Sequence, residues 1–205
     1  MRLLLSGGGS PDAVVPLDEL FISQIDIHAP TLYIPVAMEP PYNECLNWFQ
    51  KTYQPYGLRH VEMCTDLSSI QNLSQYTAIF IGGGNTFKLL NTIKNSRFDS
   101  KLLEYLNNNG LVYGGSAGAI IFGSSIKTAE YADVNSVGLN DLSGLNLTGG
   151  KDIFRHYSHK DNQYIRDYHN DLFILYEESG LFIRHDTAEP IGKPYLTRAT
   201  LESEA

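Results

Sequence analysis

The amino-acid sequence predicts a doubly wound α/β fold, in which a mostly parallel sheet carries helices on both faces. Short apolar runs alternate along the chain with longer amphipathic stretches, and this alternation implies parallel strands joined by right-handed crossovers. The run at residues 78–81 is continuously apolar, as expected for a strand covered on both sides. Glycines at residues 7–9, 82–84 and 114–115 follow three of the runs. If those strands are neighbours, their turns converge on one crevice.

Five short segments in the first 113 residues predict strands. Four are mainly apolar and cover residues 3–5, 31–34, 78–81 and 111–113, and the fifth, at 59–63, is more polar. Elsewhere in this part of the chain, apolar side chains recur at helical spacing, which predicts helices packed on the sheet. These helices cover residues 17–27, 42–53, 86–93 and 98–106, and a further one begins at Ala117. The aromatic residues of the helix at 42–53 are expected to pack in the core.

The alternation changes after residue 123. Residues 126–150 are rich in Gly, Asn, Asp and Ser, which predicts loops. A short strand is expected at 153–154 and a helix at 162–168, and the runs at 172–176 and 181–184 predict a hairpin or paired edge strands. We expect the polar tail from about residue 198 to be frayed, and residues 1–205 to form one α/β domain.

Charge and hydropathy argue against several classes of protein. Fifteen basic residues stand against 23 acidic ones, a net charge of −8, whereas nucleic-acid binding needs a clustered basic face. No apolar run approaches the roughly 18 residues of a membrane helix, and the leucines near the start are too few for a secretion signal. We therefore expect a soluble, cytoplasmic protein with no nucleic-acid or membrane partner. A homodimer is the general expectation for a protein of this kind.

Cysteines and histidines do not have the spacing of a metal centre. Cys45 and Cys64 are too few for a disulfide framework and match no metal motif, so reduced thiols are expected. The six histidines lack the H-E-x-x-H arrangement of a zinc site. We expect neither a metal ion nor a cofactor.

The motif that points most clearly to chemistry is Gly-Gly-Ser-Ala-Gly at residues 114–118, which fits the G-x-S-x-G nucleophile elbow. That elbow holds a serine hydroxyl on a tight strand-to-helix turn, and here an apolar strand precedes Ser116 while small residues follow it. The helix behind the serine directs its positive end towards developing negative charge. The motif predicts a nucleophilic Ser116, against the alternative of a purely structural turn.

A second glycine-rich turn, Gly-Gly-Gly-Asn-Thr at residues 82–86, follows a buried strand and opens a helix. Its bare N–H groups, together with the N–H of Ala117, are suited to hold an oxyanion. A phosphate cradle is the alternative, but the Gly-Lys-Ser/Thr of a P-loop and the G-x-G-x-x-G spacing are both missing. A glycine turn without a ligand is the third possibility.

The pair GGGNTF and, some thirty residues later, GGSAGA resembles the serine peptidase family of dipeptidase E and cyanophycinase. The resemblance is strongest over residues 78–122 and extends more loosely to about residue 195. It implies a glutamine-amidotransferase-like α/β fold in which serine replaces the amidotransferase cysteine. It also implies hydrolysis of short peptides by a Ser-His-acid triad, with Ser116 as nucleophile and an oxyanion hole from Gly83 or Gly84 and Ala117.

A histidine must take the proton of Ser116, because a serine hydroxyl is inert near neutral pH without a base. His156 follows a short apolar run, which places it on a strand-end loop, and the family resemblance implies the same residue; His159 is the rival. Arg155 stands where the family usually has proline, and a cation there would lower the pKa of the base. The triad acid implied by the resemblance lies between serine and histidine. The candidates are Asp133 first, then Glu130, with Glu178 and Asp152 behind them.

The substrate and the activity are less determined than the nucleophile. Aspartyl-specific relatives carry an arginine soon after the histidine, whereas Lys160 and Arg166 fall at other positions here, which argues against strict aspartyl specificity. A serine peptidase is the first hypothesis. The alternatives are an amidase or esterase that is not a peptidase, and a binding module whose triad has degraded.

Overall fold

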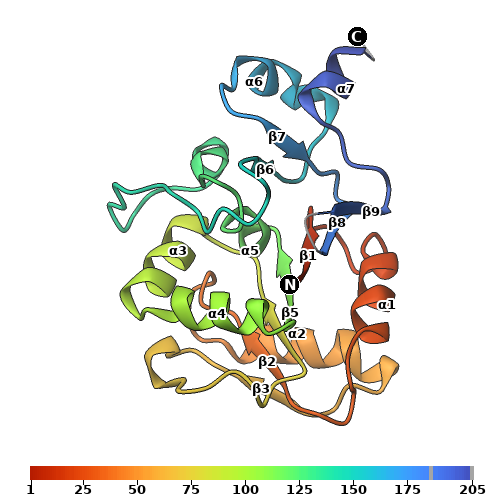
Figure 1. Ribbon diagram of the computed structural model, residues 1–205, viewed down its shortest axis with the longest axis vertical. Coiled ribbons are helices and arrows are strands. Elements are labelled where there is room, and N and C mark those ends of the chain that lie inside the picture. The colour runs from red at the N-terminus through yellow and green to blue at the C-terminus, as the bar shows by residue number, and fades with distance from the viewer. Residues whose placement is uncertain (185–186, 204–205) are drawn as a thin grey trace.

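The computed structural model describes residues 1–184 and 187–203, and it is built around a seven-stranded sheet. The strand order is β3-β2-β4-β5-β1-β8-β9 (Figure 1). Neighbouring pairs among the first five strands of this order are parallel, while β8 runs antiparallel to β1 and β9 to β8. The predicted doubly wound α/β class is confirmed. The strands are β1 (Arg2–Ser6), β2 (Thr31–Ile34), β3 (Val61–Met63), β4 (Ala78–Ile81), β5 (Leu111–Gly115), β8 (Ser179–Arg184) and β9 (Thr187–Gly192).

Helices cover both faces of the sheet because successive side chains of each buried strand point to opposite sides. Leu3 and Leu5 of β1 pack with α3, α4 and α5 in one core, whereas Leu4 packs with α1 and α2 in the other. Figure 1 shows α3 and α4 on one side of the sheet and α1 on the other. The helices are α1 (Val15–Ser23), α2 (Asn43–Tyr53), α3 (Thr86–Asn95), α4 (Phe98–Asn107) and α5 (Ala117–Ile120).

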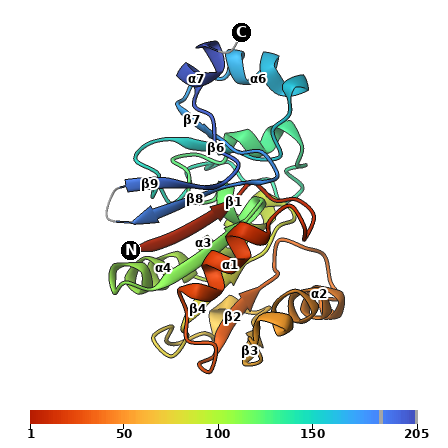
Figure 2. The ribbon, with the colours of Figure 1, turned by 90° about the vertical axis from the view of Figure 1, so that its right-hand side faces the viewer.

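The last third of the chain adds a smaller layer above β8 (Figures 1 and 2). It contains two parallel strands and two short helices, which enclose a third cluster of buried apolar side chains. These elements are β6 (Asp152–Phe154), β7 (Leu172–Ile174), α6 (Asn162–Asp167) and α7 (Arg198–Ser203). Among the described residues, no helix is both long and apolar enough to cross a membrane.

Two predictions for this layer need correction. The expected hairpin between residues 172–176 and 181–184 does not form, because β7 pairs with β6 and β8 pairs with β1 and β9. β9 was not predicted, because its sequence, Thr-Ala-Glu-Pro-Ile-Gly, contains no apolar run. Residues 198–203 form α7, where a frayed tail was expected, because Leu201 is 5% exposed and packs in the third cluster. Residues 204–205 lie outside the described part of the chain.

The strand order brings the three glycine turns together, as the sequence predicted. β4, β5 and β1 are adjacent and parallel, so their carboxyl ends lie at one edge of the sheet. Gly83, Gly115 and Gly8, one from each turn, line the same cavity. This edge is where an open parallel sheet binds its ligands.

Aromatic side chains fill the core between the sheet and α1 and α2. Phe49 and Tyr53 are buried as predicted, but Trp48 on the same helix is 42% exposed. Asp18 lies inside this core at 3% exposure, and the Tyr53 hydroxyl donates to its Oδ1 at 2.7 Å. Burial raises the pKa of Asp18 from 3.8 to about 6, although hydrogen bonds from Tyr53 and Tyr113 act in the opposite direction.

Asp18 is therefore expected to make the fold less stable as the pH rises. Its pKa is higher in the folded chain than in the unfolded one, so its contribution is fully present below about pH 4 and is lost as the pH rises through 6. Asp18→Asn removes the charge and keeps an acceptor for Tyr53. At pH 7.5 the variant should gain on the order of 2–3 kcal/mol in free energy of unfolding, and at pH 4 it should gain almost nothing. Urea unfolding at both pH values measures the gain, with the exposed Glu19→Gln as control; a variant less stable than wild type at pH 7.5 would contradict the prediction.

Candidate active site

Ser116 stands on a sharp turn between β5 and α5. Its φ of 52° and ψ of −108° lie outside the common regions for an L-residue, which is the strain typical of a nucleophile elbow. The glycines of the motif permit close backbone packing: a Cβ on Gly118 would lie 2.3 Å from the Ile81 carbonyl oxygen. The Ser116 N–H donates to the Ser6 carbonyl at 3.1 Å, which fixes the turn against the end of β1.

His156 faces Ser116 from the loop after β6. Its Nε2 lies 3.0 Å from Ser116 Oγ, so the structure brings together the two residues that the sequence indicated as nucleophile and base. His156 also has a positive φ of 53°, and its N–H donates to the Gly7 carbonyl at 3.2 Å. Gly8 lies against the imidazole: a Cβ there would be 2.3 Å from Cε1. The alternative base, His159, is exposed, and its ring packs edge to face with Tyr157.

The acid beside His156 is Glu177, which the sequence analysis did not name. Its Oε1 lies 3.2 Å from His156 Nδ1. In the β6–β7 pairing Phe154 is aligned with Ile174, so the residues that follow these parallel strands leave the sheet at the same edge. A prediction that the strand at 172–174 pairs with the strand at 152–154 would have indicated Glu177 as the acid beside His156. The predicted hairpin placed residues 177–180 in its turn instead.

Asp133, the predicted triad acid, instead pairs with Arg155. Its Oδ1 accepts a hydrogen bond from Arg155 Nη2 at 3.1 Å, and both side chains are about nine-tenths buried. Its Oδ2 accepts from the Thr86 N–H at 2.9 Å and from the Thr86 hydroxyl at 2.6 Å. Asp133 therefore joins the strand that leads to His156 to the first residue of α3, directly after the second glycine turn.

The other acids considered for the triad also lie elsewhere. Asp152 accepts hydrogen bonds from Ser124, Tyr168 and Asn170, so it holds the small layer together. Glu130 and Glu178 are exposed, and no described residue hydrogen-bonds to either side chain. Of the acids in the described chain, Glu177 is the one in contact with the His156 ring.

The surroundings favour a neutral His156. Burial lowers its pKa below 6.5, the Arg155 cation lowers it further, and the hydrogen bond with Glu177 acts in the opposite direction. When the imidazole is neutral, a proton on Nδ1 satisfies Glu177 and leaves the Nε2 lone pair facing the Ser116 hydroxyl. This is the protonation state that a general base needs.

Two backbone N–H groups beside Ser116 are available to a ligand. Gly83 packs against the serine, since a Cβ on Gly83 would lie 3.3 Å from Ser116 Cβ. Neither the Gly83 nor the Ala117 N–H has an acceptor among the described residues. Gly84 lies against Ala37 instead, where a Cβ would be 2.4 Å from the carbonyl oxygen. Of the two glycines considered for the oxyanion hole, Gly83 is the one that contacts Ser116.

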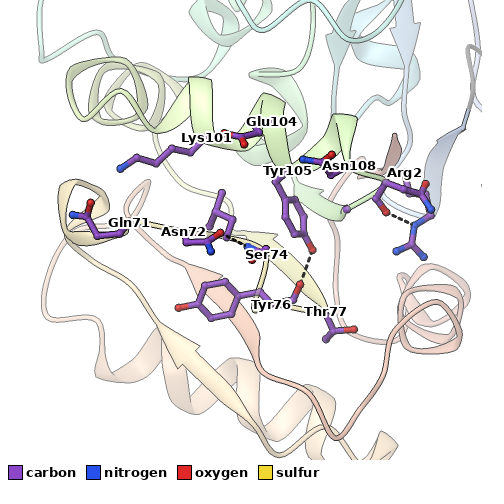
Figure 3. A pocket seen from close by; sticks show the side chains of 13 residues that line it. Arg2, Gln71, Asn72, Ser74, Tyr76, Thr77, Lys101, Glu104, Tyr105 and Asn108 are labelled. Atoms are coloured by element: carbon purple, nitrogen blue, oxygen red, sulfur yellow. Dashed lines mark hydrogen bonds between the residues drawn. The ribbon is translucent and has the colours of Figure 1, made fainter.

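Ser116 and His156 line a cavity of about 240 Å³. A second cavity of about 350 Å³ shares Trp48 and Gly83 with it. A larger cavity of about 710 Å³ lies at the opposite ends of the strands, beside Arg2 and Thr77 (Figure 3). Several of its polar groups are engaged within the fold, since Arg2 donates to the carbonyls of Asn109 and Gln24. No group of three or more metal-binding side chains occurs within residues 1–184 and 187–203.

Comparison with known proteins identifies relatives of this chain. The probable alpha-aspartyl dipeptidase of Drosophila melanogaster is 32% identical over 100 residues, which are 48% of this chain and 41% of the fly protein. The match thus spans less than half the length of that relative.

Two solved structures share the fold. One is a protein assigned as a peptidase E from Listeria monocytogenes EGD-e, with 24% identity, a TM-score of 0.75, and coverage of 92% of this chain and 96% of that one. The other is a peptidase from an acI-B1 Actinobacterium, with 15% identity, a TM-score of 0.68, and coverage of 96% and 93%. The model of Peptidase family S51 matches residues 3–191, which include the elbow, the histidine loop and Glu177. This chain therefore belongs to Peptidase family S51.

Proposed function

We propose that the protein is a serine peptidase that hydrolyses short peptides through Ser116, His156 and Glu177. The observation that carries the proposal is the 3.0 Å contact between Ser116 Oγ and His156 Nε2, at the mouth of a cavity. Membership of a peptidase family supports the same reaction. The similarity to the probable alpha-aspartyl dipeptidase of the fly supports small peptides as substrates.

The reaction begins when Ser116 Oγ attacks the scissile carbonyl carbon and its proton passes to His156 Nε2. The N–H groups of Gly83 and Ala117 donate to the oxyanion of the tetrahedral intermediate. Collapse of the intermediate breaks the C–N bond, and the departing amine takes the proton from His156, which leaves an ester on Ser116. Water then attacks this ester and gives a proton to His156. That proton returns to Ser116 as the carboxylic acid leaves.

Glu177 keeps the imidazole in the productive tautomer and stabilises the imidazolium that forms during each step. Arg155 acts in the opposite direction, since it disfavours the imidazolium and keeps the base neutral. Its charge is compensated by Asp133 at 3.1 Å. In a degraded triad, Arg155 beside the base and the lack of an acid next to it would have no role. The pairing of Arg155 with Asp133 and the contact of Glu177 with His156 support an intact triad instead.

A fluorophosphonate probe tests the nucleophile. We expect the probe to label the wild-type protein and to leave Ser116→Ala unlabelled, because phosphonylation requires the activated hydroxyl. His156→Ala should be labelled at least 10²-fold more slowly, since the base accounts for about 10²–10⁴ of the rate. Ser100→Ala, at an exposed position of α4, is the control. Labelling that persists in Ser116→Ala, or fails in wild type, counts against the proposal.

Glu177→Gln should lower kcat for a dipeptide by on the order of 10². The amide cannot accept the Nδ1 proton as a carboxylate does, so the imidazolium loses its stabilisation. Glu178→Gln removes the same charge from the next residue, which is exposed and does not contact the ring, and should leave kcat within twofold of wild type. Equal effects of the two substitutions, measured by dipeptide hydrolysis, would disprove the role of Glu177.

The acid limb of kcat/KM is expected to lie below pH 6.5, since His156 must lose its proton to act and its pKa is lowered. The double variant Asp133→Asn, Arg155→Gln removes both members of the buried pair, so neither charge is left unpaired. The Arg155 cation affects the pKa of His156 more than Asp133 does, so the limb should move to higher pH in the variant. A pH profile of both proteins checks this, and an unmoved limb would refute the electrostatic role of Arg155.

A further inference from the structure

A buried carboxylate lies in the wall of the cavity that opens on Ser116. Asp18, in the first turn of α1, lines the same cavity of about 240 Å³ as Ser116 and His156, and it is 3% exposed. The Tyr53 hydroxyl donates to Asp18 at 2.7 Å, and Tyr113 also hydrogen-bonds to the carboxyl. The mechanism above makes no use of this group.

The charge of Asp18 has no counter-charge in the cavity. Within the described part of the chain, neither lysine nor arginine lines it, and His156 is the one other titratable group besides tyrosines. The remaining large side chains in the wall are Pro11, Val14, Trp48, Tyr53, Phe80 and Tyr113. Because a buried carboxylate is costly without a partner of opposite charge, the cavity is complementary to a cation.

The adjoining cavity of about 350 Å³ is acidic as well. Glu39 and Glu44 line it, together with Trp48 and Gly83 that it shares with the first cavity. The cation nearby is Lys88, whose Nζ lies 3.0 Å from Glu39 and donates to the Met38 carbonyl. The cleft therefore carries carboxylates on both sides of the glycine turn that faces Ser116.

We infer that the cleft selects substrates that present a protonated amine or guanidinium to Asp18, from the amino terminus or a basic side chain of the residue whose carbonyl Ser116 attacks. This inference rests on the proposed hydrolytic function. Trp48, which also lines the cavity and is 42% exposed, supplies an aromatic side chain that can attract the same cation. An acidic side chain in the same position would meet Asp18 with like charge, which disfavours aspartyl substrates. Lys160 and Arg166 are exposed and line neither cavity.

A panel of dipeptides with one common leaving residue tests the inference. Arg-Ala and citrulline-Ala differ in side-chain charge at nearly the same size, N-acetyl-Arg-Ala removes the terminal ammonium, and Asp-Ala reverses the charge. We measure kcat/KM for each by release of alanine, in the wild type, Asp18→Asn and Glu19→Gln. Glu19 is the next residue of α1 and is exposed, so it controls for loss of one negative charge.

At least one of two changes, removing the side-chain charge or removing the terminal ammonium of the substrate, should lower kcat/KM of the wild type about tenfold or more. This is the size expected when one partner of a desolvated charge pair is lost. A penalty on citrulline identifies the side chain as the bound cation, and a penalty on acetylation identifies the terminal ammonium. In Asp18→Asn that penalty should shrink towards unity, while Glu19→Gln keeps it. Penalties below tenfold in the wild type, an unchanged penalty in Asp18→Asn, or Asp-Ala as the best substrate would overturn the inference.

The inference and the proposed function fail in different ways. Labelling of Ser116 by a neutral fluorophosphonate needs no cation. If the protein is labelled but kcat/KM does not depend on substrate charge, the inference is wrong and the proposed function stands. Absence of both labelling and hydrolysis removes the proposed function and the inference with it. If Asp18→Asn does not fold, as judged by circular dichroism, inhibition of the wild type by arginine amide and by citrulline amide makes the same comparison. Equal inhibition by the two amides would show that the side-chain charge is not recognised.

Discussion

Two consecutive carbonyls, at the end of β1 and just after it, hold Ser116 and His156 in one place. The Ser6 carbonyl accepts the N–H of Ser116, and the Gly7 carbonyl accepts the N–H of His156. Ser6 is the last residue of β1, which pairs with β5 along its length, and Gly7 follows directly, so both turns are held against the end of a central strand. Ser116 and His156 each adopt a positive φ, a conformation that persists only where surrounding contacts impose it. Gly8 completes the constraint, because any larger residue would displace the imidazole.

The buried pair of Asp133 and Arg155 is a second connection between the same regions. It joins the approach to His156 to the start of α3, and the Asn85 side chain also donates to the Val134 carbonyl at 2.8 Å. The turn that contains Gly83 is thereby attached to the histidine loop by contacts other than those of the sheet. Breaking one half of a buried ion pair leaves an uncompensated charge, so the pair acts as a unit. Arg155 also lowers the pKa of His156, so the pair influences both the geometry and the protonation of this residue.

The parts of the fold that the sequence predicts are those with a local physical signature. The predicted bounds of β2 and β4 agree with the structure at both ends of each strand. The glycines after β1, β4 and β5 indicated the turns that meet at the site. Glu177 had no such signature, since it is a half-exposed acid whose contact with His156 depends on the pairing of β7 with β6, two strands some twenty residues apart. A polar strand such as β9 was missed for a related reason: its pairing with β8, and not its own composition, makes it a strand.

Glu177 and Asp18 differ in what they contribute to the fold. Glu177 is half exposed beside the imidazole, so water shares the stabilisation of its charge. Asp18 is enclosed by aromatic side chains, and its raised pKa shows that the folded state resists its ionisation. An asparagine at position 18 would accept the same hydrogen bond from Tyr53 without that cost, so packing does not account for the charge. A cation entering the cavity, as inferred above, would supply the missing counter-charge and favour the ionised carboxyl. On that inference, the stability lost through Asp18 and the selection of cationic substrates have one cause.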